Sequence, residues 1–445
     1  MSKVQVCSAI MGSGKSSGAR SYALENQDKK YIYVAPFLDE ARKFAMDCAP
    51  LNFVEPEKLS EFNRSKIKHI EHLVKQGANI SSTHAAFAGL TNEALEDIAE
   101  NKYTLICDET VDAVRSDETQ AKDLILLERA GMLRKDGEMY RFVGDDDYID
   151  GESKYTDLCR LARSNNVVFG SEEKPGGGKN LYYYLLLPPE FIKSFERVIV
   201  LTYMFESSNL CALFKLYGID YEYIGIERID YGNGYMLSPN GTYVPDYIYD
   251  LKNKIHIHED GGSWFGKRGR PPISLNTYDV GGGKIPDKRE FKPTYNFFKK
   301  KENEELFLQL KNNQRNFFDR LIKQNGGSHD NCMWSTYEPA RKKIESRGLR
   351  EKWVAFNSRA TNDYCDRNYL SYIVDPHFRP ELKQFYIDRN IEYDERQWAI
   401  STAVQWVWRS ACRKGDEVWL YCPSSRLRNG INKWLDDVSN GVIIK

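Results

Sequence analysis

KVQVCSAIMGSGKS, residues 3–16, carries a short apolar run straight into a glycine-rich turn that ends in Lys15 and Ser16. Gly12 and Gly14 have no Cβ, so they permit the positive φ angles that turn backbone N–H groups inward around an anion. A helix beginning near Lys15 presents its unpaired N–H groups and the positive end of its dipole to the same anion. The stretch therefore predicts a phosphate-binding loop between a strand and a helix.

The residues of this loop predict a site for a nucleoside triphosphate with Mg²⁺. Lys15 is expected to reach the β- and γ-phosphates, and the Ser16 hydroxyl to ligate the metal. The usual pattern is G-x-x-x-x-G-K-[ST], and its first glycine is replaced by Ala9, a small residue that such loops tolerate. The residues predicted to bind ATP are Ala9, Met11, Gly12, Ser13, Gly14, Lys15, Ser16 and Ser17.

Composition limits the class of protein. The chain has 445 residues and 41% hydrophobic content, which predicts two domains. Its 9 cysteines include no C-x-x-C pair, as expected of free thiols in a reducing compartment. The first strand begins at about residue 4 and no apolar run reaches membrane-spanning length, so we expect no signal segment, no membrane and a cytoplasmic location, in the host cytoplasm if the protein is viral.

Charge gives no general attraction for nucleic acid, because 63 basic and 64 acidic residues leave a net charge of −1. A nucleic-acid partner would need local basic and aromatic surface in a cleft.

Apolar runs along the chain predict two α/β domains with parallel sheets. The first domain is expected over 1–230 with an insertion at about 111–189, and the second over 231–445 with an irregular insertion at about 255–300. The predicted strands are 3–7, 31–35, 79–82, 103–107 and 197–201 in the first domain, and 331–335, 353–356, 369–374 and 417–421 in the second.

Two acids follow the apolar run at 103–107. Hydrolysis of a γ-phosphate needs one carboxylate to hold the Mg²⁺ shell and a second to polarise the attacking water. Asp108 and Glu109 stand side by side at a predicted strand end, so Asp108 is the expected metal ligand and Glu109 the expected base.

A third group of polar residues lies near the end of the chain. Gln405, Arg409 and Arg413 are spaced i, i+4 and i+8, which places all three on one face of a helix predicted over 405–413. Two guanidiniums and an amide on one face suit a triphosphate held between domains, with an arginine finger from the second domain.

Taken in order, these segments resemble the motifs of superfamily 2 helicases, the DExx-box motors built from two RecA-like domains, and are similar to helicase-like proteins of bacteriophages. The resembling segments are 9–16 (motif I), 35–36 (Ia), 83–84 (Ib or Ic), 108–110 (II), 202–203 (III), 359–363 (V) and 405–413 (VI). Three features depart from the family: motif II reads Asp-Glu-Thr-Val, Trp408 replaces the glycine that many members have, and no adenine-reading glutamine motif precedes the loop.

The resemblance implies an ATP-dependent DNA helicase or translocase of phage-type replication or recombination. It implies catalytic roles for Lys15, Asp108, Glu109, Arg409 and Arg413, nucleotide contact by Gln405, and ATP with Mg²⁺ as cofactors. Nucleic-acid contacts are implied for Pro36, Thr83, His84, Thr202 and Thr361. The implied partners are single-stranded or forked DNA and replication or recombination proteins, and a monomer can form a complete ATP site.

Two alternatives remain open. A packaging ATPase also combines a phosphate loop with paired acids, although it ordinarily adds a nuclease domain that the C-terminal portion does not suggest. A nucleic-acid-binding protein that uses ATP only as a conformational switch would keep the loop without needing turnover. Translocation polarity, DNA against RNA, and unwinding against translocation alone are not predicted.

Overall fold

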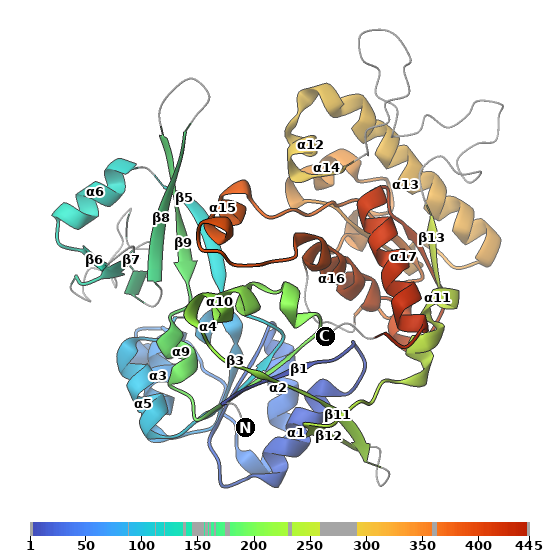
Figure 1. Cartoon of the computed structure of the whole chain (residues 1–445). Helices are drawn as coiled ribbons and strands as arrows, with labels where there is room; N and C mark the ends of the chain where they lie inside the picture. Colours follow the sequence, from blue (N-terminus) through green and yellow to red (C-terminus); the bar gives the residue numbers. More distant parts are fainter. Residues whose placement is uncertain are drawn as a thin grey trace. The chain divides into compact units, whose positions relative to one another are not determined.

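A computed structural model of the chain divides into two compact units (Figure 1). The first comprises Met1–Tyr243 and Phe378–Tyr393, and the second comprises Val244–His377 and Asp394–Ile444. The residues described below are 3–87, 89–111, 113–119, 121–136, 139–144, 155, 159, 162–163, 166–173, 179–229, 234–258, 292–357 and 363–442.

The first unit is built on a 7-stranded sheet in the order β12-β11-β1-β10-β4-β2-β3. Every neighbouring pair in it is parallel except β11 with β12. The strand that precedes the phosphate loop, β1, is thus separated from β4, which precedes the two acids, by β10 alone. The strands are β1 (Val4–Ser8), β2 (Tyr31–Ala35), β3 (Ile80–Thr83), β4 (Thr104–Asp108), β10 (Arg197–Thr202), β11 (Glu222–Ile229) and β12 (Gly234–Ser238).

Polar caps and left-handed residues fix where the helices of this unit begin and end. The Ser65 hydroxyl accepts from the Lys68 N–H, and Gly77, at φ 71°, closes the same helix. The helices are α1 (Lys15–Glu25), α2 (Leu38–Asp47), α3 (Lys66–Gln76), α4 (His84–Phe87), α5 (Asn92–Glu100), α9 (Pro189–Lys193), α10 (Asn209–Tyr217) and α15 (Pro380–Asp388), with 3₁₀ turns at Ala49–Leu51, Ser60–Phe62 and Phe205–Ser207.

The segment predicted as an insertion at 111–189 forms a separate antiparallel sheet of 5 strands, in the order β5-β9-β8-β7-β6. A small core that includes Leu127, Leu133, Cys159 and Leu185 packs beside it. The strands are β5 (Val114–Thr119), β6 (Leu133–Asp136), β7 (Met139–Phe142), β8 (Asn166–Glu173) and β9 (Lys179–Leu186), and helix α6 covers Ala121–Arg129.

The second unit contains a parallel sheet of 4 strands in the order β13-β16-β15-β14. Its strands are β13 (Ile255–His258), β14 (Cys332–Ser335), β15 (Tyr369–Tyr372) and β16 (Val418–Tyr421). Its helices are α11 (Leu251–Lys254), α12 (Tyr295–Lys299), α13 (Glu304–Asn325), α14 (Arg341–Ile344), α16 (Glu395–Trp408) and α17 (Ser425–Ser439), with 3₁₀ turns at Asp246–Asp250, Lys301–Asn303, His329–Asn331, Glu338–Ala340, Arg350–Lys352 and Ala411–Lys414.

Two expectations for this unit are corrected. Residues 353–356 form no strand: Trp353 makes one isolated bridge to Trp334, where the Val354 N–H donates to the Trp334 carbonyl, and the Trp353 indole N–H donates to the Thr336 carbonyl. Residues 255–258, expected in an irregular insertion, form strand β13, which pairs with β16. Of the remainder of that insertion, 259–291 lie outside the described residues, and Tyr295–Lys299 form helix α12.

The unit boundary also differs from the predicted one. It falls after Tyr243 rather than at 230, because β12 pairs with β11 and the Tyr243 N–H donates to Ile226 of that strand. Helix α15 belongs to the first unit although 231–445 was expected to form the second domain. The Phe385 ring lies 4.6 Å from that of Tyr184, and the Tyr386 hydroxyl donates to Asn209.

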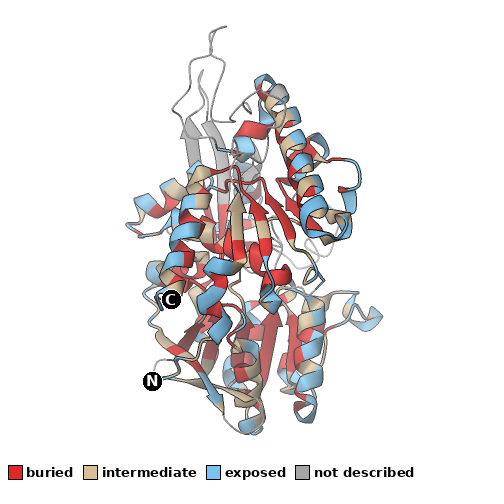
Figure 2. Cartoon of the chain, turned by 90° about the vertical axis from the view of Figure 1, so that its right-hand side faces the viewer, coloured by how far each residue is buried: buried red, intermediate tan, exposed pale blue. Residues whose placement is uncertain are grey.

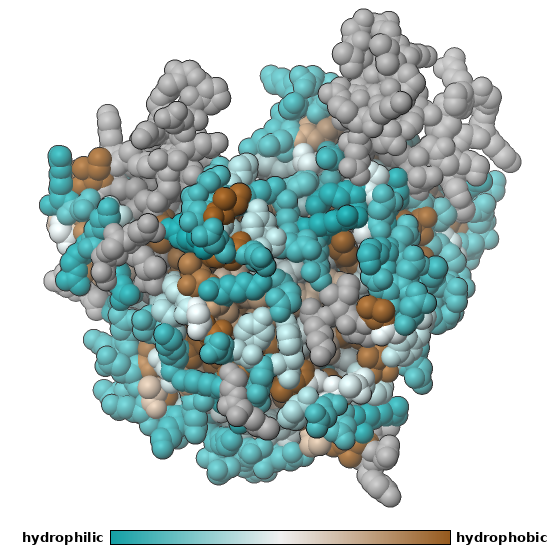
Figure 3. Space-filling model, in the orientation of Figure 1, coloured by the Kyte–Doolittle hydropathy of each residue, from teal (hydrophilic) through white to brown (hydrophobic). Residues whose placement is uncertain are grey.

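The fold is therefore α/β with parallel strands in the main sheet of each unit, which confirms the predicted α/β class. Buried residues concentrate on the sheet strands (Figure 2), while the face shown in Figure 3 is mostly hydrophilic with scattered apolar side chains. No described helix combines the length and the apolar character needed to cross a membrane.

Candidate nucleotide site

The glycine-rich turn adopts the backbone that its sequence predicts. Gly12 and Gly14 have φ angles of 80° and 89°, in the region that favours glycine. Helix α1 begins immediately afterwards at Lys15, with Gly18 N–H donating to the Gly14 carbonyl and no side chain capping the helix start. The first N–H groups of α1 are thus available for an anion beside the turn.

Hydrogen bonds and burial hold the other residues of the turn in place. The Ala9 N–H donates to the Thr202 carbonyl at 3.0 Å, tying the turn to β10, and the Lys15 ammonium donates to the Ala9 carbonyl at 2.6 Å. Met11 is buried. The Ser13 hydroxyl is fully buried and has no partner among the described residues, so a polar group of a ligand would satisfy it.

Ser16 and Asp108, predicted as metal ligands, come together although they are far apart in the sequence. The Ser16 hydroxyl donates to Asp108 Oδ2 at 2.8 Å, and Asp108 ends strand β4. A hydroxyl and a carboxylate in contact beside a phosphate loop are oxygen donors of the kind that Mg²⁺ prefers. The residues present therefore fit the predicted metal.

Tyr33 also contacts this carboxylate and was not predicted. Its hydroxyl donates to Asp108 Oδ2 at 2.7 Å, and its ring stacks on Phe44 with centroids 3.7 Å apart. Burial, reinforced by the Asp108 charge, raises the pKa of Tyr33 well above its ordinary value, so the hydroxyl stays protonated and donates. The alternation of side chains along β2 can be predicted from the sequence. The contact of Tyr33 with Asp108 cannot, because it depends on the pairing of β2 with β4.

Glu109 sits on strained backbone at the strand end. Its φ angle is 62°, a left-handed value that costs a residue with a side chain about 1–3 kcal/mol. The surrounding sheet holds it there: the Glu109 N–H donates to the Leu201 carbonyl at 2.8 Å, and the Thr202 hydroxyl lies 3.4 Å from Glu109 Oε2. The Glu109 carboxylate is thus in direct contact with the residue that ends β10.

Cys7 lies on β1 just before the loop, and its thiol is protonated. Burial, only partly offset by Lys15 and reinforced by Asp108, raises the pKa of this thiol to about 12. The sulfur is therefore protonated at neutral pH.

The residues expected to touch nucleic acid in the first unit gather at the carboxyl edge of its sheet. Pro36 follows β2, Thr83 ends β3, His84 begins α4 and Thr202 ends β10. Thr361, predicted on the second unit, lies outside the described residues.

The helix predicted over 405–413 begins and ends earlier than expected. Helix α16 ends at Trp408 with Arg409 as its C-cap, because the Ser410 hydroxyl bonds to the Val407 carbonyl and caps a following 3₁₀ turn. Gln405 therefore remains on the α-helix, whereas Arg413 lies on the turn, and the three side chains do not share one helical face.

The exposure of the two arginines differs accordingly. Arg409 is only 6% exposed, whereas Arg413 is exposed. Of this pair, Arg413 is the guanidinium accessible to an incoming ligand.

A buried ion pair stands at the carboxyl edge of the second sheet and was also not predicted. Arg426 donates through two nitrogens to Asp375 Oδ1, at 2.8 and 2.6 Å, and His377 lies 3.7 Å from Oδ2. Burial opposes ionisation of Asp375, but attraction to His377 and Arg426 outweighs it and lowers the pKa of the carboxyl.

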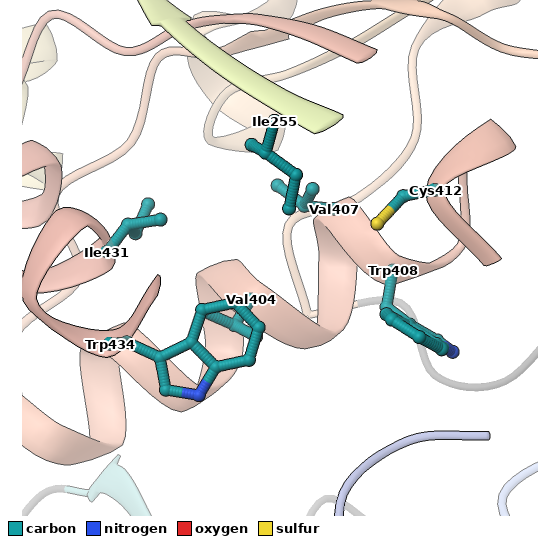
Figure 4. Close-up of a pocket in the computed structure, with 7 residues that line it drawn as sticks. All are labelled: Ile255, Val404, Val407, Trp408, Cys412, Ile431 and Trp434. Carbon is teal, nitrogen blue, oxygen red and sulfur yellow. The ribbon is translucent and has the colours of Figure 1, made fainter. Parts of the chain in front are cut away.

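The second unit also has a small apolar cavity, of about 10 Å³. Its walls come from β13, α16, α17 and the turn after α16 (Figure 4). The lining residues are Ile255, Val404, Val407, Trp408, Cys412, Ile431 and Trp434. A space of this size holds at most about one water molecule and offers it no polar partner, so it is a packing gap rather than a ligand site.

Comparison with known proteins relates the chain to one protein and one domain family. A family model described as the YonV C-terminal Rossmann-like domain matches residues 274–435, a range that contains β14, β15 and β16. The SPbeta prophage-derived uncharacterized protein YonV of Bacillus subtilis (strain 168) is 26% identical over 444 residues, 98% of this chain and 100% of that protein.

Solved helicase structures are more distant. An apo XPD structure aligns with 98% of this chain and 95% of its own at 12% identity and a TM-score of 0.46. Xpd4 of S. tokodaii aligns with 97% and 94% at 10% identity and a TM-score of 0.44. The DUF1998 helicase MrfA, bound to DNA and AMPPNP, aligns with 99% and 48% at 12% identity and a TM-score of 0.31. With every score below 0.5, no conclusion about chemistry follows from these likenesses.

Proposed function

We propose that the chain is an ATP-dependent DNA helicase or translocase that hydrolyses ATP at the carboxyl edge of the first sheet. The observation that carries the proposal is the contact of Ser16 with Asp108 beside Lys15, with Glu109 next in sequence. A strand end, a glycine turn and a helix start bring a cation, a metal-binding pair and a second carboxylate to one place.

The residues divide the work by their chemistry. The Gly12–Ser16 backbone and the Lys15 ammonium would hold the phosphates, and Ser16 with Asp108 would hold Mg²⁺, which would offset the charge that develops on the phosphate oxygens. Met11, Ser13 and Ser17 complete the wall of the loop.

Glu109 acts on the attacking water. Its carboxylate accepts a proton from the water, the water oxygen bonds to the γ-phosphorus, and the bond from that phosphorus to the β,γ-bridging oxygen breaks to leave ADP. The Thr202 contact orients the carboxylate, and it also gives the strand end at β10 a direct connection to the reacting group.

The second unit supplies the arginines in this proposal. Arg413, exposed on its turn, is the better arginine finger, and buried Arg409 positions the turn that carries it, with Gln405 one helical turn earlier. These roles rest on charge and on motif order.

Nucleic acid completes the proposal. Pro36, Thr83, His84, Thr202 and Thr361 are the proposed contacts to single-stranded or forked DNA, at positions where such motors meet the phosphate backbone. Full-length similarity to a prophage-derived protein favours a role in phage-type replication or recombination, beside other proteins of that process.

The decisive experiment is ATP turnover by the full chain with no polynucleotide, single-stranded DNA, duplex DNA and RNA. We expect stimulation by single-stranded or forked DNA, and loss of ATP binding and turnover in Lys15→Ala. Turnover that no polynucleotide stimulates would overturn the motor. Binding of ATP and DNA without turnover would instead identify an ATP-controlled binding protein.

A further inference from the structure

The phosphate loop has an aromatic wall supplied by a distant part of the first unit. A Cβ atom placed on Gly14 would lie 2.6 Å from Cδ1 and Cγ of the Tyr235 ring. The ring therefore lies directly against the loop backbone, at the residue that immediately precedes α1. Tyr235 is on β12, more than two hundred residues later in the sequence.

The hairpin of β11 and β12 is built to hold this ring in place. Arg228 pairs with Tyr235 across the hairpin, and the hairpin packs along α1, as Figure 1 shows. A Cβ on Gly18 of α1 would lie 3.4 Å from the Leu237 backbone nitrogen. Helix and hairpin thus approach to backbone contact, which leaves the ring little room to move away from the loop.

A second aromatic ring flanks the first. The Tyr243 ring centroid lies 5.5 Å from that of Tyr235, and the Arg228 guanidinium lies 5.8 Å from the Tyr243 centroid. Both tyrosines pack on the core of the unit and remain partly exposed. Both rings are therefore supported by the core and remain partly accessible, and that of Tyr235 lies beside the loop.

We propose that Tyr235, supported by Tyr243, is the platform on which the nucleotide base stacks. The inference rests on the proposed function, because the phosphates must first occupy the loop. With the phosphates held at Gly12–Ser16, the ribose and base extend away from the loop, and the partly exposed ring against Gly14 is an apolar surface next to them. In this proposal, the contact to the base comes from β12, the strand at one edge of the first sheet.

Stacking on a ring carries little information about the base. Every base has a π-face, so a platform of this kind binds purine nucleotides with similar strength. We therefore expect ATP and GTP to bind within about threefold of each other, since hydrogen bonds to base edges rather than stacking give strong discrimination.

The test compares nucleotides with a ligand that has no base. Affinities for ATP, GTP and inorganic tripolyphosphate are measured by calorimetry for the full chain and for Tyr235→Ala, Tyr235→Phe and Tyr22→Ala. Tyr22 is the matched control, a partly buried tyrosine near the C-terminal end of α1 that packs on the same core. Thermal melting of each variant checks that it is folded.

We expect Tyr235→Ala to lose about tenfold or more in affinity for ATP and GTP and to keep its affinity for tripolyphosphate. Tyr235→Phe and Tyr22→Ala should bind all three like the wild type. The emission of 2-aminopurine riboside triphosphate should be quenched by the wild type and by Tyr235→Phe, as stacking requires.

Three results would overturn the platform while leaving the proposed function intact: unchanged nucleotide affinity in Tyr235→Ala, an equal loss for tripolyphosphate, or a preference for ATP over GTP of a hundredfold. Failure of the wild type to bind tripolyphosphate and ATP would instead overturn the proposed function itself. If Tyr235→Ala does not fold, the quenching comparison between the wild type and Tyr235→Phe still decides, since absence of quenching in both contradicts stacking.

Discussion

The two parallel sheets of this chain both end in polar residues, but they place them in opposite surroundings. At the first edge, Asp108 and Glu109 are partly exposed and Ser16 is exposed. At the second edge, Thr336 and Asp375 are fully buried. Similar architecture therefore leaves the Asp108 carboxylate accessible to a ligand and commits the Asp375 carboxylate to an ion pair within the fold.

The largest effect expected at the first edge is on catalysis. Glu109→Gln keeps the size of the side chain and removes its capacity to accept a proton, so kcat for ATP should fall about 10²–10⁴-fold while ATP affinity stays within a few-fold. Steady-state turnover and equilibrium ATP titration measure the two quantities.

Glu55→Gln is the matched control, since Glu55 makes a surface contact with Arg42. It should leave both quantities unchanged. Persistent turnover in Glu109→Gln would show that another group activates the water. It would also contradict the catalytic role of Glu109 at the first edge.

The second edge should respond in stability. Asp375→Ala leaves Arg426 without its buried partner, and we expect the free energy of unfolding to fall by about 3 kcal/mol. Urea denaturation measures it. The control, Asp437→Ala, breaks the exposed pair with Lys433 and should cost less than about 1 kcal/mol. Equal losses in the two variants would contradict a structural role for the buried pair.

The same pair predicts a pH dependence with a defined sign. Because the folded pKa of Asp375 lies below its ordinary value of 3.8, the unfolded chain takes up the proton first. The stabilisation is fully present above about pH 4 and is lost as the pH falls through the folded pKa. In denaturation between pH 6 and pH 3, the advantage of the wild type over Asp375→Asn should shrink below about pH 4; a constant difference would exclude this carboxyl as its source.

The smallest effect should come from Tyr33→Phe, which removes one hydrogen bond to Asp108 and costs about 1 kcal/mol of stability. Tyr31→Phe is the matched control, on the same strand and equally buried, with a hydroxyl that donates to the Asn26 carbonyl. Both variants should lose similar stability, but only Tyr33→Phe should change the Mg²⁺ concentration needed for half-maximal turnover. A shared change, or none, would separate Tyr33 from the metal site.

The sequence predicts features that are local in the chain. The loop at 9–16 needs only its own glycines and the adjacent strand and helix, and Asp108 follows an apolar run that is a strand by itself. The strands at 31–35 and 197–201 were predicted within a residue of their bounds for the same reason.

Features that depend on contacts between residues far apart in the sequence could not be predicted in this way. Tyr33 and Tyr235 acquire their neighbours from strand pairing and from the packing of a hairpin on a helix. The end of the helix predicted over 405–413 was placed too late, because the spacing of residues does not show that the Ser410 hydroxyl caps a new turn there. The apolar run 353–356 meets β14 at an isolated bridge, and contacts of the Trp353 side chain with Thr336 and Arg341 hold it there.

The excursion of Phe378–Tyr393 into the first unit has a consequence for how this chain can be divided or recombined. The polypeptide passes between the units after Tyr243, after His377 and after Tyr393, so neither unit corresponds to an uninterrupted stretch of gene. A fragment ending at Tyr243 would uncover the Tyr184 surface that Phe385 occupies. Exchanging the second halves of two such genes would also exchange α15, so the side chains around Tyr184 and Asn209 must match the incoming helix for the hybrid to fold.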